Sequence, residues 1–206
     1  MRGKPKRHGA RLSDLTQMKR IHEADWFWFE GQGWKVNARG SGLFVHILRA
    51  LLGVFNEALN KQRRVFVFRF DVRLKCFSET NRVASSIVSQ LRKRAELLYP
   101  GSAFRYCWVR EQGVFDPQHY HFVLFMDGRY IQHPHRLQRE IQVISALLEG
   151  VPHWSGYHRI DRLSDRYLET LQQASYHISY LAKVRTKGKR LDTVRDYSIS
   201  RLKGGS

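Results

Sequence analysis

The sequence predicts an α+β domain whose antiparallel sheet carries helices on one face, with a helical extension at the N-terminus. Three patterns along the chain of 206 residues lead to this prediction. Apolar residues alternate with period two at several places between residues 65 and 160, as expected of strands. Helical spacing occurs between these segments, and a further amphipathic helix follows the last of them.

Residues 1–60 are expected to form a basic, aromatic-rich extension that contains one helix. Its aromatic cluster consists of Trp26, Phe27, Trp28, Phe29 and Trp34. We favour rings that pack on the domain, and a platform for stacked bases is the alternative. Ser41 is suited to cap a helix that runs to about residue 60, because apolar residues recur there at helical spacing.

The first expected strand covers residues 65–74. One of its faces is apolar throughout, whereas the other begins with valines and then turns polar at Arg69, Asp71 and Arg73. For Asp71 we prefer an ion pair with one of these arginines over a role as a ligand. A helix is expected from about residue 81 to residue 98, where a Pro-Gly pair ends it.

Two apolar, aromatic-rich strands follow at residues 104–111 and 119–126, and the turn residues between them indicate a hairpin. Residues 136–148 have helical periodicity. A short strand is expected at residues 157–160 after a loop, and a helix at residues 165–183.

The predicted order is therefore helix, then β-α-β-β-α-β, then helix. The middle part is the ferredoxin-like pattern, a sheet with helices on one face, which leaves the other face available for a ligand. We assign residues 61–185 to this domain and residues 186–206 to a basic C-terminal tail.

Composition limits the class of protein. Hydrophobic residues make up 42% of the chain, which is typical of a folded domain rather than a disordered segment. No apolar run approaches the length of a membrane span, and no signal-type segment follows the basic N-terminus, so we expect a cytoplasmic protein without a membrane partner. Cys76 and Cys107 are too few for a disulfide framework and are expected to be reduced.

Charge points to a polyanionic partner. Lysine and arginine number 36 against 18 acidic residues, which gives a net charge of +18. Residues 1–20 and residues 183–206 each carry a net charge of +6, so most of the excess lies at the two ends. Such ends are typical of arms that track phosphates, and the alternative is a pair of solvated tails that aid solubility.

His119 and His121 open the third expected strand, and alternation places both imidazoles on one face. Two imidazoles in this position can hold one divalent ion. The chain contains 10 histidines, so a pair of this kind also arises by chance. A second pair, His133 and His135, lies in a proline-containing turn that we assign to the surface.

The hairpin adds a carboxylate to the first pair. We expect Glu111 to face His119 where the loop closes. Val109 then faces His121, and because directly opposed residues share a sheet face, one carboxylate and two imidazoles form a cluster. Such a cluster leaves coordination positions open, which suits Mg²⁺ or Mn²⁺ better than a closed zinc site. The alternative for Glu111 is a solvated acid at the loop edge.

The last expected helix carries two phenols and an ammonium on one stripe. Tyr176 and Tyr180 are four residues apart, and Lys183 is three residues further on. A phenol ionises near a pH of about 10, so it needs help to react at neutral pH. Polarisation of a phosphate by a metal and a nearby lysine can supply that help. The alternative is that the tyrosines pack and the lysine complements the helix dipole.

Together these motifs resemble the HUH endonucleases of rolling-circle replication. The shared features are two histidines around a hydrophobic residue on a strand, an acid in the preceding strand and Tyr-x-x-Lys on a later helix. More narrowly, roughly residues 60–202 resemble the replication proteins of filamentous phages, the inovirus replication-initiator type. The segments that carry this resemblance are Arg69-Phe70-Asp71, Trp108-Val-Arg-Glu111, Gln118-His-Tyr-His121, Ser179-Tyr-Leu-Ala-Lys183 and Ser198-Ile-Ser-Arg201.

The resemblance implies an endonuclease that nicks and rejoins single-stranded DNA at a replication origin. His119, His121 and Glu111 would hold Mg²⁺ or Mn²⁺ against the scissile phosphate. Tyr180 would attack this phosphate and leave a 5′-phosphotyrosine with a free 3′-OH, while Lys183 would stabilise the developing charge or position the phosphate.

The resemblance leaves some roles open. Tyr176 is either a second nucleophile or a packing residue. The alternative functions are a non-catalytic DNA-binding or replication-control protein of a phage or prophage, and an HUH transposase or relaxase. No helicase-type phosphate loop occurs in the sequence, so a host helicase is an expected partner. The basic residues expected to contact DNA are Arg69, Arg73, Arg110, Arg185, Lys187, Lys189 and Arg190.

Deleting residues 1–20 is predicted to weaken binding to DNA of any sequence, because binding of cationic side chains to phosphates is driven by counterion release. For single-stranded DNA, the slope of log affinity against log salt falls by about 0.7 for each phosphate that the shortened chain no longer neutralises. Anisotropy titrations of a labelled oligonucleotide at several salt concentrations measure this slope for the full and shortened chains. An unchanged slope would assign these residues to a solvated tail.

Overall fold

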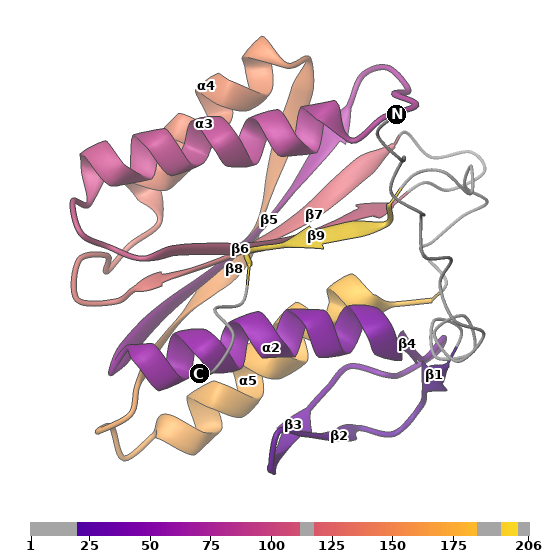
Figure 1. Ribbon diagram of the computed structural model, residues 1–206, viewed down its shortest axis with the longest axis vertical. Coiled ribbons are helices and arrows are strands. Elements are labelled where there is room, and N and C mark those ends of the chain that lie inside the picture. The colour runs from indigo at the N-terminus through magenta and orange to yellow at the C-terminus, as the bar shows by residue number, and fades with distance from the viewer. Residues whose placement is uncertain (1–19, 112–117, 185–194, 202–206) are drawn as a thin grey trace, which may run out of the picture.

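The computed structural model describes residues 20–111, 118–184 and 195–201. At its centre lies an antiparallel sheet of five strands in the order β8-β5-β7-β6-β9 (Figure 1). The strands are β5 (Arg64–Leu74), β6 (Phe104–Glu111), β7 (His119–Asp127), β8 (Gly150–Asp161) and β9 (Tyr197–Ile199). Strand β5 pairs with both β7 and β8, and β6 pairs with both β7 and β9.

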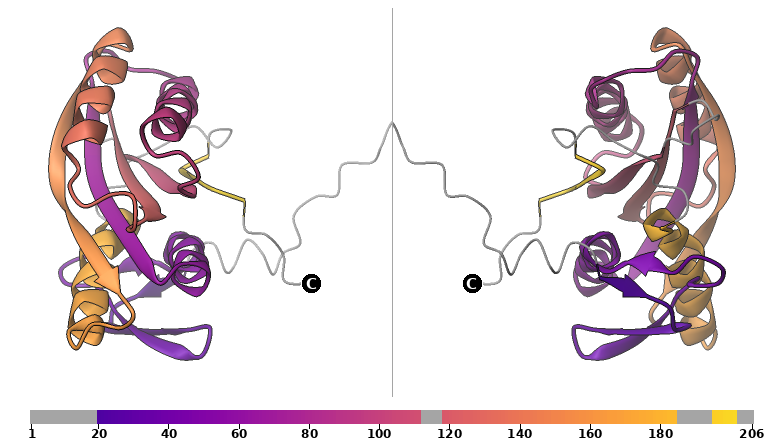
Figure 2. Two further views of the ribbon diagram at one scale, coloured as in Figure 1. Left: turned by 90° about the vertical axis from the view of Figure 1, so that its left-hand side faces the viewer. Right: turned by 90° about the vertical axis from the view of Figure 1, so that its right-hand side faces the viewer.

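Four α-helices pack on this sheet in the described part of the chain. They are α2 (Val45–Lys61), α3 (Arg82–Leu98), α4 (His135–Leu147) and α5 (Tyr167–Ser179), and α5 continues into the 3-10 turn η1 (Tyr180–Ala182). Figure 1 shows α3 and α4 on one side of the sheet and α2 and α5 on the other, and the two layers stay apart in the side views of Figure 2. None of these described helices combines the length and the apolar character that crossing a membrane requires.

Strand alternation gives the sheet two apolar cores. Phe66, Phe68 and Phe70 share a core with α3 and α4, and Phe70 stacks on Phe122 of β7 with 4.9 Å between ring centroids. Val65 and Val67 of β5 point to the other face, where they share a core with α2 and α5. Burial of one such aromatic side chain contributes about 1.5–3 kcal/mol, so both helix layers are firmly attached to the sheet.

The α+β class and the antiparallel sheet are confirmed, and β5, α3, β6, β7, α4 and β8 follow one another in the expected β-α-β-β-α-β order. The expectation of helices on one face is wrong, because α2 and α5 cover the second face. The physical reason lies in α2, which carries a continuous stripe of buried apolar residues. Such a stripe is stable only against another apolar surface, and the second face of the sheet supplies it.

The one helix expected in residues 1–60 is present as α2, and the described segment before it forms short strands that we did not expect. Strands β2 (Trp26–Phe29) and β3 (Gln32–Lys35) form a hairpin, and β1 (Ile21–His22) pairs with β4 (Leu43–Phe44). Ser41 does not cap α2, whose N-cap residue is Phe44. Gly42 explains the late start, because its φ is 68° and a Cβ there would clash with Ile21. The chain therefore pairs with β1 before the helix begins.

The aromatic cluster divides between the two sides of the β2–β3 hairpin. Phe27 and Trp34 are opposite each other in register and are buried, and the Trp34 ring lies 5.4 Å from that of Phe55 in α2. Trp26 and Trp28 are 45% and 74% exposed. Packing is therefore confirmed for the first pair, and base stacking stays a prediction for the second.

Strand β8 replaces the loop and short strand that we expected between residues 150 and 161. It lies at the edge of the described sheet, where Pro152 can be accommodated without an N–H donor. Its pairing with β5 shifts at a bulge that contains Ser155, and the φ of Gly156 is 125°. This bulge brings the Ser155 hydroxyl to Asp71 of β5, to which it donates a hydrogen bond of 3.3 Å.

A half-buried histidine pair joins β8 to α5. His158 Nε2 and His177 Nδ1 lie 3.0 Å apart. Burial lowers the pKa of His158. Burial is also the largest influence on His177, and with the positive charges of Arg69 and His158 it lowers the pKa of His177 to about 4, although the Asp71 carboxylate opposes this effect. The His177 ring is therefore neutral in the folded protein at neutral pH.

This pKa makes stability depend on pH. The unfolded chain binds a proton at His177 below a pH of about 6.5, whereas the folded chain does so only below about 4. We therefore predict that the free energy of unfolding decreases as the pH falls from about 6.5 to about 4, by about 1–2 kcal/mol from this group, because solvent screens the half-buried ring. Urea titrations at several pH values measure the decrease.

His177→Gln should make the decrease smaller, because the variant has no imidazole to protonate at that position. His133→Gln is the matched control, since His133 is an exposed histidine, and it should keep the pH dependence of the original chain. The same pH dependence in His177→Gln and the original chain would contradict the assignment.

Candidate metal centre

The candidate metal centre is built on the β6–β7 hairpin. Glu111 pairs with His119, and Val109 pairs with His121, so the register predicted from the sequence is confirmed. Residues 112–117, which connect the two strands, lie outside the described residues. Because directly opposed residues point to the same side of a sheet, the carboxylate and both imidazoles share one face.

Glu111, His119 and His121 offer ligand atoms that all lie within 4.8 Å of one another. His119 Nε2 lies 3.5 Å from the Glu111 carboxylate, and His121 Nε2 also contacts this carboxylate. Glu111 and His121 are buried, and His119 is half-buried. One carboxylate and two imidazoles are donors that a divalent cation accepts, and three protein ligands leave positions for water or phosphate.

His121 lies between two carboxylates. Its Nε2 contacts Glu111, and its Nδ1 lies 2.7 Å from Oδ1 of Asp71. A neutral imidazole has one N–H group and can donate to only one of them. A cation bound at Nε2 would leave the Nδ1–H group to donate to Asp71, which is how metal-bound histidines are commonly oriented. The surroundings of His121 therefore fit a metal ligand.

Asp71 has a closer relation to the site than the sequence indicated. It pairs with His121 across β5 and β7, and its Oδ2 lies 3.7 Å from Nη2 of Arg69, so the preferred ion pair is present. Burial alone would raise the pKa of Asp71, but the hydrogen bond with His121 and the nearby positive charges outweigh burial and lower it. Asp71 therefore stays ionised and orients His121.

Tyr180 lies beside this cluster. Its ring is edge-on to that of His121, with 5.5 Å between centroids. The Arg69 guanidinium lies 4.4 Å from the centre of the Tyr180 ring, and its Nη1 donates to the carbonyl of His177. Burial lowers the pKa of Arg69, although Asp71, Tyr180 and Glu111 act in the opposite direction. Arg69, predicted to contact DNA, is only 8% exposed and instead connects the end of α5 to the sheet.

Lys183 does not continue the helical stripe that we predicted. Helix α5 ends at Ser179, Tyr180 begins η1, and Lys183 follows it with a ψ of 133°. The backbone turns away because residues 183 and 184 pair with the chain at Gly42 and Leu43. The Lys183 side chain is buried, and its ammonium donates to the carbonyl of Arg39.

Tyr176 lies within α5, one turn before Tyr180. Its carbonyl accepts a hydrogen bond from the Ser179 hydroxyl, and its side chain is half-buried. The ring contact between this end of α5 and the triad is made by Tyr180. The geometry therefore favours Tyr180 as the residue that works with the triad.

A small cleft opens next to His119. Its volume is about 130 Å³, and it is lined by Asp71, Arg73, His119 and His153. Arg73, which we expected to contact DNA, is exposed and pairs with His119 in register, so its charge lies beside the triad. His153 pairs with Asp71 from β8. The sequence did not predict a place for His153 in the site, because the residues around it were assigned to a loop.

The remaining residues that we expected to contact DNA lie elsewhere. Arg110 pairs with Tyr120, which places it on the face opposite the triad, and it donates to the carbonyl of Ser78. Arg185, Lys187, Lys189 and Arg190 lie outside the described residues. His133 and His135 are exposed, so their assignment to the surface is confirmed.

Comparison with known proteins identifies one family. A family model described as the YagK/YfjJ C-terminal domain matches residues 31–195, about four fifths of the chain. The matched region includes the whole triad, Asp71 and Tyr180. No curated protein and no solved structure matches the chain significantly.

We predict that the triad binds one Mn²⁺ per chain. His121→Ala should abolish this binding, and Asp71→Asn should weaken it by about 10–100-fold, because loss of an orienting carboxylate typically has that effect. His133→Ala removes an exposed histidine and serves as the control. Isothermal titration with Mn²⁺ measures affinity and stoichiometry, and equal affinities in His121→Ala and His133→Ala would exclude the site.

Proposed function

The chain belongs to the YagK/YfjJ C-terminal domain family, and we propose that it is a metal-dependent endonuclease that nicks and rejoins single-stranded DNA. The observation that carries this proposal is the position of Tyr180, whose ring adjoins His121 and lies beneath the Arg69 guanidinium. A potential nucleophile thus lies beside a cluster of metal-ligand type. This combination suits transfer of a phosphodiester to the tyrosine.

The proposed reaction uses the triad and one tyrosine. Mg²⁺ or Mn²⁺ held by Glu111, His119 and His121 would supply Lewis-acid polarisation of a phosphate oxygen. The Tyr180 oxygen attacks phosphorus, so a bond from oxygen to phosphorus forms and the bond to the 3′ oxygen breaks. The phenolic proton passes through solvent to the departing 3′ oxygen. The products are a 5′-phosphotyrosine and a free 3′-OH, and rejoining reverses these steps.

Two arginines favour this chemistry. Arg69 lies over the Tyr180 ring and is positioned to hold the ring against the triad. Arg73 lines the small cleft beside His119, where its guanidinium can bind a phosphate. Lys183 was expected to contact the phosphate, but because it donates to Arg39 we assign it to positioning the chain after α5.

The architecture and the charge support the wider proposal. The order β8-β5-β7-β6, with α3 and α4 in the two crossovers, agrees with a ferredoxin-like sheet of the HUH/RRM type. A net charge of +18 suits a DNA partner such as a replication origin. We propose that the protein acts in the cytoplasm with a host helicase.

A cleavage assay with tyrosine variants tests this function. Circular single-stranded DNA of mixed sequence is incubated with Mn²⁺ and protein, and covalent adducts are digested and located by mass spectrometry. Tyr180→Phe is predicted to lower cleavage by at least about 10³-fold, because it removes the nucleophile. Tyr130→Phe, which changes an exposed tyrosine, should cleave like the original chain.

The same assay separates the alternatives. Loss of strand joining but not of first cleavage in Tyr176→Phe would identify a second nucleophile. DNA binding without an adduct at any metal concentration would favour a non-catalytic replication-control protein. Undiminished cleavage by Tyr180→Phe would exclude the nucleophile assigned here. A transposase or relaxase would use the same chemistry and is distinguished by the DNA sequence it cleaves.

A further inference from the structure

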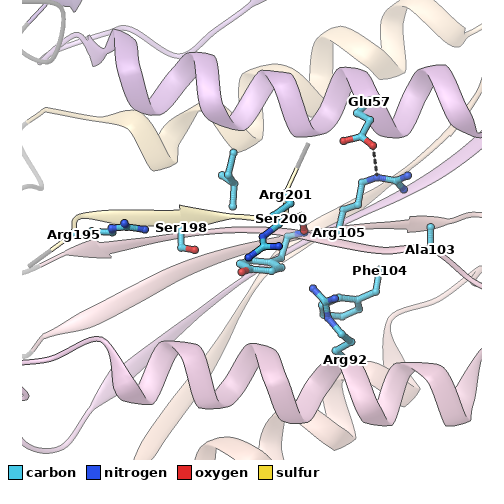
Figure 3. A pocket seen from close by; sticks show the side chains of 11 residues that line it. Glu57, Arg92, Ala103, Phe104, Arg105, Arg195, Ser198, Ser200 and Arg201 are labelled. Carbon is cyan, nitrogen blue, oxygen red and sulfur yellow. Dashed lines mark hydrogen bonds and ion pairs between the residues drawn. The ribbon is translucent and has the colours of Figure 1, made fainter. Parts of the chain in front are cut away.

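A second cleft lies at the edge of the sheet, around β9 and the adjoining part of β6 (Figure 3). Its volume is about 780 Å³, and residues from α2, α3, β6 and the segment around β9 line it. Arg105 of the lining is six residues from Glu111, about 20 Å along β6, whereas Arg195 lies nearer the Glu111 end, since the carbonyl of Asp196 accepts from the Arg110 N–H. None of the residues that line the cleft belongs to the triad.

Arginine dominates the lining of this cleft, which we call the arginine cleft. The four arginines are Arg92, Arg105, Arg195 and Arg201. Glu57 is the one acid among the lining residues, and it lies 3.8 Å from Arg105 and also contacts Lys61. Figure 3 shows Arg105 turned towards Glu57 on α2, and Arg92 on the α3 side of the sheet. Positive charge therefore exceeds negative charge around the cleft.

The opening exists because β9 is short. It pairs with β6 at Cys107 to Val109, and Ser200 then makes two hydrogen bonds to Tyr106. The Ser200 hydroxyl accepts from the Tyr106 N–H at 2.8 Å, and the Ser200 N–H donates to the Tyr106 carbonyl at 2.9 Å. The cleft lies around this end of β9, where Ser198 and Ser200 add hydroxyl groups to its lining.

Two aromatic rings lie among these arginines. Phe104 and Tyr106 are half-buried in β6, and their ring centroids are 6.5 Å apart. The Arg92 guanidinium lies 5.5 Å from the centre of the Phe104 ring. Arginines bind phosphates and stack on bases, and aromatic rings stack on bases. A cleft that combines both groups has the chemistry that recognises a single nucleic acid strand.

We propose that the arginine cleft, whose lining residues all lie outside the triad, binds single-stranded DNA at a second site. Its arginines contact the phosphates, and Phe104 with Tyr106 supplies ring surface for the bases. An acidic protein segment would find the same charges but would make no use of base stacking. This site does not require the metal centre to be catalytic, because every group that forms it lies outside the triad.

Salt-dependent binding of an oligonucleotide tests the site. Titrations in EDTA remove any contribution from a bound metal and from cleavage. The test variant is Arg92→Ala/Arg201→Ala, and the control is Lys93→Ala/Arg159→Ala, which removes the same charge from exposed positions outside the cleft. The test variant is expected to bind a labelled thymidine oligonucleotide about tenfold more weakly, with a slope of log affinity against log salt lower by about 1.4.

The controls decide between the site and general charge. The control pair should keep most of the original slope, and both pairs should unfold at the temperature of the original chain. Equal losses of affinity in both pairs, or an unchanged slope in the test pair, would overturn the proposal. Unlabelled DNA and poly-glutamate are also compared as competitors at equal concentrations of negative charge. If poly-glutamate displaces the oligonucleotide as well as DNA does, the proposal is overturned in favour of an acidic protein partner. The two proposals can fail separately. If the test pair has a lower slope but the original chain does not nick DNA in the cleavage assay, the arginine cleft is supported and the proposed function is refuted.

Discussion

The position of β7 between β5 and β6 brings together Glu111, His119, His121 and Asp71 in the candidate metal centre. β6 places Glu111 opposite His119, while β5 places Asp71 opposite His121. If the pairing of β7 with β5 or with β6 shifted by one residue, the side chains of the shifted strand would move to the other face, where phenylalanines form a core. That core resists such a shift, because each misplaced aromatic ring would forgo about 1.5–3 kcal/mol of burial. Packing of the apolar face therefore fixes the strand register, and this register brings the polar side chains of the metal centre together on the other face.

Helices α2 and α5 make the second face of the sheet both a core and a site. Their apolar side chains cover Val65 and Val67 of β5, and the end of α5 reaches the polar half of the same strand. There Arg69 is buried between Asp71, the Tyr180 ring and the carbonyl of His177. A buried guanidinium is costly without partners, and these three groups offset the cost. The same contacts hold Tyr180 at the triad.

Local sequence patterns predict those structural features that depend on residues close together in the chain. Alternation and a short turn were enough to place Glu111 opposite His119, because a hairpin pairs segments close in the chain. The contact between Asp71 and His121 joins strands 50 residues apart, and no local pattern encodes that register. The β8 bulge and the end of α5 also depend on distant partners, so His153 was missed and Lys183 was misplaced. The second helix layer was missed because α2 was treated as an extension rather than as part of the core.

The triad as a cation site beside Tyr180 is the central claim, and anomalous diffraction tests it directly. Crystals of the full chain soaked in Mn²⁺ and measured at the manganese edge locate the ion without reference to activity. One anomalous peak is predicted within about 2.0–2.3 Å of ligand atoms of Glu111, His119 and His121. A crystal that holds Mn²⁺ elsewhere but shows no peak at this position would contradict the claim.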